Sequence, residues 1–86
     1  METLNLDIMK CLNWVRDFYS HMYPIFGLKK MPPLPEIRIS YDKETTIRGM
    51  KSGNILIITK NPQEIMEYIC AHESSHTLHE WSNPNL

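Results

Sequence analysis

The chain has 86 residues, of which 42% are hydrophobic and 22% are charged, and its formal net charge is −1. This composition is typical of a small globular domain and excludes an intrinsically disordered chain, so we expect residues 1–86 to form a single domain. The near-neutral charge gives no electrostatic reason to expect nucleic acid or an anionic membrane as a partner. No apolar run approaches the roughly 20 residues that span a bilayer, so no membrane association is expected.

The two cysteines, Cys11 and Cys70, belong to no CxxC spacing. Each lies on the apolar face of a predicted helix, so we expect two buried thiols rather than a disulfide framework. Residues 1–7 carry acidic and polar side chains where a signal peptide has a basic segment. These features predict a cytoplasmic protein in a reducing compartment.

A one-sided apolar stripe at helical spacing predicts an amphipathic helix near the start of the chain, and Thr3 or Asn5 can cap its start. Its members are Leu4, Ile8, Cys11, Leu12, Val15, Tyr19 and Met22. We expect Pro24 to end this helix, because the residue before a proline is pushed away from helical angles. The proline-rich segment 31–35 then predicts a stiff, extended connector.

Three strands are predicted next. Residues 36–41 alternate between apolar and polar side chains, which is the pattern of a half-buried strand. Residues 45–50 carry a weaker strand pattern. Residues 54–59 are apolar and rich in β-branched side chains, and Ser52 and Gly53 before them are a turn signal. The second and third strands could therefore form a hairpin.

The last predicted element is a helix. Asn61 is a good N-cap, Pro62 suits the first helical position, and Glu64 stands where a capping box needs it. The helix is expected to run to about Trp81, with Pro84 as its stop. Its buried stripe is expected to contain Ile65, Met66, Ile69 and Cys70. The predicted fold class is thus α+β, with a helix, a small three-stranded sheet and a second helix.

Residues 72–76 read His-Glu-Ser-Ser-His, an H-E-x-x-H motif on the last predicted helix. Residues four apart on a helix are stacked neighbours, so His72 and His76 can each donate a ring nitrogen to one zinc ion at about 2.0–2.1 Å. Glu73 points about 100° away around the helix, yet it can reach a water molecule held by that ion and take its proton. This is the arrangement that zinc-dependent hydrolysis of a peptide bond requires.

The helical phase places His72 and His76 on the same face as Ile65 and Ile69. We therefore expect the histidines to continue the buried stripe, where unpaired polar groups would be costly and a metal ion would satisfy them. The alternative is a helix whose histidines are merely solvated or hydrogen-bonded to each other.

Over residues 36–81 the chain resembles the zincin clan of zinc metallopeptidases, on the strand 54–59 and the motif helix that follows it. The resemblance implies that His72 and His76 are metal ligands and that Glu73 is the general base and acid. It also implies that strand 54–59 is an edge strand that pairs with an extended peptide substrate.

The order of helix, small sheet and motif helix is similar to the minigluzincins, the smallest members of that clan. The run from Ala71 to His79 is also similar to the ImmA/IrrE group, and the SprT-like proteins are a third neighbour.

The sequence leaves the third zinc ligand open. Gluzincins take it from a second helix well downstream of the motif, whereas ten residues follow His76 here. On a straight helix Glu80 is about 12 Å from His72 along the axis, so both cannot hold one ion unless the helix breaks. His79 has the same difficulty to a lesser degree. The candidates are Glu80, His79, His21, a residue of a second copy of the chain, a solvent molecule, or no third ligand.

These observations predict a zinc-dependent metallopeptidase that acts on a peptide or protein substrate. The alternative is a catalytically inactive, metal-binding module with a regulatory or interaction role. A homodimer that completes its site across the interface is a third possibility.

Overall fold

A computed structural model describes the backbone of residues 2–83 and the side chains of residues 6–83. Its elements are α1 (Glu2–Met22), β1 (Glu36–Ser40), β2 (Gly49–Ser52), β3 (Ile55–Thr59) and α2 (Gln63–Ser82). The predicted α+β class is confirmed, as are both helices, and residues 31–35 form neither helix nor strand. Among the described residues, no helix has the length and apolar character needed to cross a bilayer.

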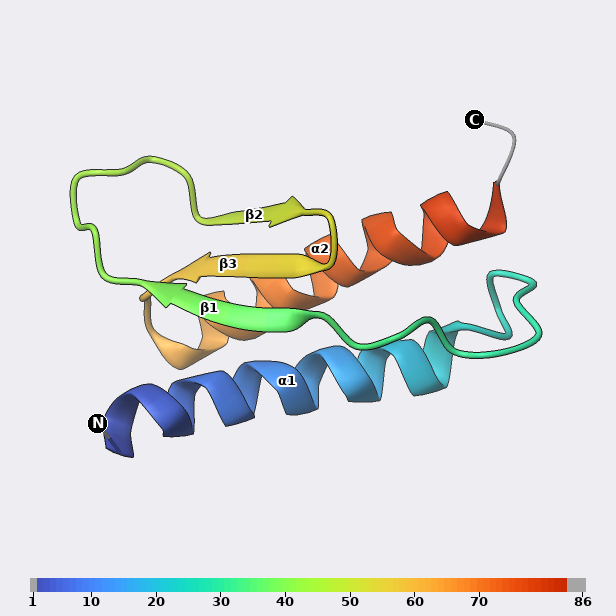
Figure 1. The fold of residues 1–86 in the computed structure, drawn as a ribbon, viewed down its shortest axis with the longest axis horizontal. Coiled ribbons are helices and arrows are strands. Elements are labelled where there is room, and N and C mark those ends of the chain that lie inside the picture. Colours follow the sequence, from blue (N-terminus) through green and yellow to red (C-terminus); the bar gives the residue numbers. More distant parts are fainter. Residues whose placement is uncertain (1, 84–86) are drawn as a thin grey trace.

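The sheet has the order β1-β3-β2, with β1 parallel and β2 antiparallel to the central strand β3. Helix α1 packs on β1, α2 packs on β2 and β3, and the two helices pack on each other. Figure 1 shows α1 running below β1 and α2 behind the sheet, in the direction opposite to that of β3. Both helices therefore cover one face of the sheet.

Alternate residues of β1 and β3 supply the sheet side of the core. Ile37 lies beside Leu56 in the parallel register, and Ile39 lies beside Ile58 on the same face. The helices contribute the other buried apolar side chains, which are Cys11, Val15, Tyr19, Met66, Ile69, Cys70 and Leu78. The core is thus a single apolar layer between the sheet and the helix pair.

The two cysteines meet inside this layer. Cys11 and Cys70 are free thiols with no exposed surface, as the sequence predicts. A hydrogen bond between the thiols, together with burial, raises the pKa of Cys70 above its ordinary value. Cys70 is therefore held as a protonated thiol that packs like a small apolar side chain.

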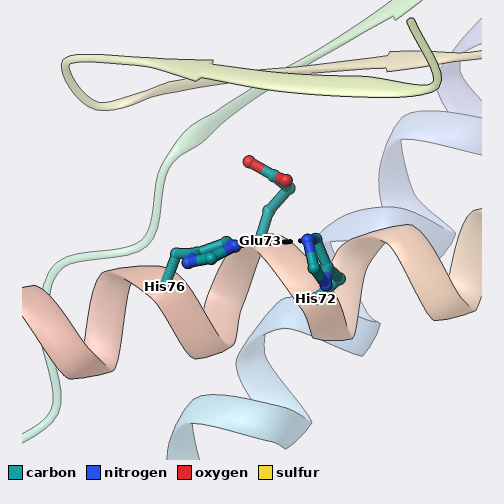
Figure 2. A group of neighbouring side chains, drawn as sticks. All are labelled: His72, Glu73 and His76. Carbon is teal, nitrogen blue, oxygen red and sulfur yellow. Dashed lines mark hydrogen bonds between the residues drawn. The ribbon is translucent and has the colours of Figure 1, made fainter.

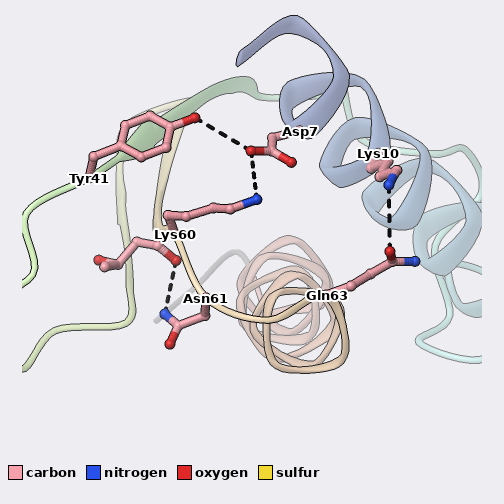
Figure 3. A network of polar contacts seen from close by, with 7 residues as sticks. Asp7, Lys10, Tyr41, Lys60, Asn61 and Gln63 are labelled. Atoms are coloured by element: carbon pink, nitrogen blue, oxygen red, sulfur yellow. Dashed lines mark hydrogen bonds and ion pairs between the residues drawn. The ribbon is translucent and has the colours of Figure 1, made fainter. Parts of the chain in front are cut away.

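A polar network joins α1 to the carboxyl ends of β1 and β3 (Figure 3). Asp7 is nearly buried and accepts a bond from Nζ of Lys60 at 2.9 Å and one from the Tyr41 hydroxyl at 3.4 Å. The hydrogen bond to Asp7 raises the pKa of Lys60. Nearby, Lys10 of α1 donates to Gln63 in the first turn of α2. These contacts fix where α2 begins relative to α1.

The second strand lies later in the chain than the predicted 45–50, and this prediction was wrong in its boundaries. The two-residue turn at Gly53 and Asn54, with Gly53 at φ +60°, sets the hairpin register. In that register residues 49–52 pair with residues 55–58, and Arg48 pairs with Thr59. Residues before Arg48 have no strand partner, because the chain leaves the sheet after Thr59. The predicted hairpin itself is confirmed.

The prediction that 54–59 is an edge strand was also wrong, because β3 is flanked on both sides. The two outer strands are β1 and β2, and the one beside α2 is β2.

The predicted capping box at Asn61 and Glu64 does not form. Helix α2 begins one residue later than expected, with Pro62 at the N-cap position and no capping side chain. The Asn61 amide donates instead to the carbonyl oxygen of Thr59 at 3.0 Å, which closes the turn between β3 and α2.

The helix α2 ends at Ser82, one residue beyond the predicted end. Pro84, the predicted stop, lies outside the described residues.

One buried hydroxyl yields a stability prediction. Ser74 of α2 is 2% exposed, and its Oγ has no hydrogen-bond partner among the described residues. Ser74→Ala should raise the free energy of unfolding by about 1–2 kcal/mol, since it removes an unsatisfied buried group and favours the helix. Ser75→Ala is the matched control, because Ser75 is only half-buried and gains helix propensity alone. Equal gains in urea denaturation would contradict this account of Ser74.

Candidate metal centre

Helix α2 brings two imidazoles together one turn apart. Nε2 of His72 and Nε2 of His76 lie 3.2 Å from each other. Their ring centroids are 4.7 Å apart, and the ring planes are nearly perpendicular, at 89°. Figure 2 shows both rings on the same side of the helix. The helical spacing therefore produces the convergence of ring nitrogens that the motif predicts.

The separation of the two nitrogens matches the bite of a zinc chelate. Two nitrogens 3.2 Å apart, each about 2.05 Å from a common ion, subtend about 103° at that ion, close to the tetrahedral angle that zinc prefers. The same distance lies at the long end of the range for an N–H···N hydrogen bond, in which one ring donates to the other. The distance between the two nitrogens therefore suits a shared metal ion.

Glu73 completes the cluster from the sheet side of the helix. Ligand atoms of His72, Glu73 and His76 all lie within 4.8 Å of one another. In Figure 2 the Glu73 side chain points from α2 toward the strands, away from the two rings. Its carboxylate makes no hydrogen bond or ion pair with any of the side chains described, so its oxygens are available to a water molecule at the site.

The histidines are exposed, contrary to the prediction that they continue the buried stripe. The buried residues of α2 are Met66, Ile69, Cys70, Ser74, Thr77 and Leu78. This stripe faces α1 and the sheet, and Ile65 lies at its margin, where it is only half-buried. At about 100° per residue the histidines fall on its outer side, whereas Glu73 stays near its edge and is half-buried.

The site is consequently open. A cavity of about 460 Å³ lies elsewhere, between the loop after β1 and the end of β3, and is lined by residues such as Tyr41, Arg48 and Lys60. None of the three motif residues lines it. A large ligand would therefore reach the histidines across the surface of α2, beside β2.

No additional side chain of the described residues joins the cluster, which contains His72, Glu73 and His76 alone. His21 of α1 instead donates from Nδ1 to the Asp17 carbonyl oxygen at 2.7 Å. His79 and Glu80 continue α2 beyond the motif, as its straight-helix geometry requires. The intrachain candidates His21, His79 and Glu80 are therefore not brought to the histidines.

Two residues beside the motif are absent from the sequence prediction. Tyr68, one turn before His72, stacks on the ring of His72. Gly49 of β2 lies against Glu73, since a Cβ built on Gly49 would be 3.8 Å from Cγ of Glu73 and would overlap Cγ2 of Ile69. The spacing of Tyr68 from His72 is visible in the sequence, whereas the contact of Gly49 depends on the sheet order.

Gly49 yields a second prediction. Gly49→Ala is expected to lower the free energy of unfolding by about 1–3 kcal/mol, because the added methyl group displaces Ile69 or pushes β2 off α2. Ser52→Ala, at the exposed end of the same strand, is the control and should change stability little. Urea denaturation measures both variants, and a Gly49→Ala protein as stable as wild type would show that β2 does not pack closely on α2.

Comparison with protein-family models, with curated proteins and with solved structures gives no match. What the chain possesses is therefore an α+β fold and a His-Glu-His cluster, in an H-E-x-x-H motif, that could hold a metal ion.

Proposed function

We propose that this chain is a zinc-dependent peptide hydrolase in which His72 and His76 hold the ion and Glu73 is the general base. One observation carries the proposal: the two Nε2 atoms are set 3.2 Å apart, at the bite of a zinc chelate, with a carboxylate in the same cluster. A purely structural zinc site has no need of a carboxylate that points away from its ligands.

The residues divide the chemistry between them. A zinc ion held at the site would polarise a substrate carbonyl and lower the pKa of a water molecule to about 7. His72 and His76 would hold the ion through Nε2, with the ring proton on Nδ1. Glu73 takes a proton from the attacking water on a carboxylate oxygen and passes it to the amine nitrogen that leaves. Its half-buried position beside β2 holds that carboxylate in place.

The outer edge of β2 suits an extended peptide substrate. Thr59 donates its backbone N–H to Arg48 at 2.9 Å, which makes Arg48 and Thr59 a hydrogen-bonded pair. By the alternation of an antiparallel ladder, the backbone groups of Gly49 and Lys51 face away from β3. A peptide that adds to this edge as a fourth strand would pass over Glu73. In this proposal β2 takes the substrate-binding role that the zincin resemblance implies for 54–59.

Purified protein tests the proposal directly. Zinc-loaded protein should cleave members of a library of internally quenched peptides, chelation should abolish cleavage, and added zinc should restore it. A zinc-loaded, folded protein that cleaves none of the peptides would count against the hydrolase.

The second candidate is a metal-binding module without catalysis. It is favoured by the absence of a third intrachain ligand among the described side chains, since catalytic zinc sites commonly use three protein ligands. This module would bind zinc and gain thermal stability from it without cleaving peptides. Measuring oligomeric state with and without zinc tests whether a second copy supplies the missing ligand.

A further inference from the structure

Tyr68, His72 and His76 form a ladder along the outer face of α2, each one turn from the next. The rings of Tyr68 and His72 are stacked, with centroids 6.1 Å apart and planes inclined by 22°. The rings of His72 and His76 meet edge to face, at 4.7 Å and 89°. His72 is therefore flanked on one side by a parallel ring and on the other by a perpendicular one.

The orientation of the His72 ring decides whether the chelate forms. An imidazole nitrogen donates its lone pair in the plane of the ring, so rotation about the last side-chain torsion would carry the Nε2 lone pair away from an ion shared with His76. A parallel aromatic neighbour restricts that rotation, because the rotated ring would collide with it or lose the stacking contact. The motif histidines are exposed and lack the packing that would otherwise hold them.

Tyr68 itself has no place in the core, since 67% of its surface is exposed. An exposed tyrosine on a helix needs no explanation by itself. Here, however, the Tyr68 ring stacks on the His72 ring, whose orientation decides whether His72 and His76 can share an ion. Substituting Tyr68 removes no buried contact from the core, so its effect on the site can be measured in folded protein.

We propose that Tyr68 is a positioning residue for the metal centre, which stacks on His72 and holds its Nε2 toward the ion shared with His76. The role rests on the proposed metal site and uses the face of the Tyr68 ring; the hydroxyl has no part in it. Neighbours that orient a metal ligand are a general means of raising the affinity of a site.

The test compares zinc affinity, measured by competition with a chromophoric chelator, in wild type, Tyr68→Phe and Tyr68→Leu. Tyr68→Leu should bind zinc about 2- to 10-fold more weakly, the range that an aromatic pair contributes. Tyr68→Phe keeps the ring face and should bind as wild type does. Trp81→Leu is the matched control, an aromatic-to-leucine change on the same helix outside the ladder, and should leave the affinity unchanged.

A second readout needs no metal. In the zinc-free protein, the ring protons of His72 should show a ring-current shift in the NMR spectrum that Tyr68→Leu removes and Tyr68→Phe keeps. Circular dichroism confirms that each variant retains its helices.

Three outcomes would overturn the proposal. A Tyr68→Leu protein that binds zinc as tightly as wild type would remove the role of Tyr68 and leave the metal site intact. A Tyr68→Phe protein as weak as Tyr68→Leu would exclude stacking as the cause. A wild-type protein that binds no zinc would overturn the metal site, and the role of Tyr68 with it.

Discussion

Zinc affinity is expected to fall about 100-fold or more when either His72 or His76 is replaced with alanine. Each substitution removes one of the two ring nitrogens that converge within 3.2 Å, so a chelate becomes a single imidazole contact. Both histidines are exposed, and the variants should therefore remain folded. Competition with a chromophoric chelator measures the affinity, and elemental analysis gives the number of ions bound per chain.

His79→Ala is the matched control for these variants. It removes the same side chain from the same helix, at an exposed position outside the cluster. We expect its zinc affinity to equal that of wild type, and likewise for His21→Ala in α1. A loss in His79→Ala as large as that in His76→Ala would show that the ion is held by a different set of ligands.

Glu73→Gln is expected to lower the rate of peptide cleavage by about 10²- to 10⁴-fold while zinc remains bound. The amide cannot accept the proton that a carboxylate takes from the attacking water, and general base catalysis commonly contributes a factor of this size. Zinc binding should persist because both ring nitrogens remain and the amide has nearly the same size and shape as the carboxylate. The assay compares cleavage of one fluorogenic peptide by wild type and variant at equal zinc content.

Glu80→Gln makes the same chemical change one turn beyond His76 and should leave the rate unaltered. Equal cleavage by Glu73→Gln and wild type would remove Glu73 from the mechanism. Cleavage in neither protein would instead favour the metal-binding module without catalysis.

Local patterns predict the helices and the motif well, because both depend on residues close together in the chain. Pro24 correctly predicts where α1 ends, and α2 ends within one residue of its predicted end. The predicted start of α1 was wrong, because α1 begins at Glu2 and Thr3 and Asn5 lie within it. The convergence of His72 and His76 follows from helical geometry alone, since residues four apart always stack. These features needed no knowledge of the rest of the fold.

Features that depend on distant contacts could not be predicted in the same way. The periodicity of α2 allows two phases, one through Ile65 and one through Cys70, and only packing against α1 and the sheet selects the second. That choice turns His72 and His76 outward. Likewise, the strand pattern of 54–59 does not say which strands lie beside it. Its central place in the sheet is known only from its pairing with β1 on one side and β2 on the other.

Gly49 shows the same limit at the site itself. It lies 24 residues before Glu73 in the chain, and only the fold brings it against that side chain. A lone glycine near a weak strand pattern is compatible with a bulge, a turn or the close approach of another element. The structure selects the last of these and so identifies β2 as the strand beside the cluster.

X-ray absorption at the zinc edge of the loaded wild-type protein tests the chelate most directly. We predict one zinc ion per chain, with two imidazole nitrogens at about 2.0–2.1 Å, both lost in the His72→Ala/His76→Ala variant. A spectrum dominated by sulfur ligands, or one left unchanged by the double substitution, would contradict the claim that this pair of histidines binds the metal.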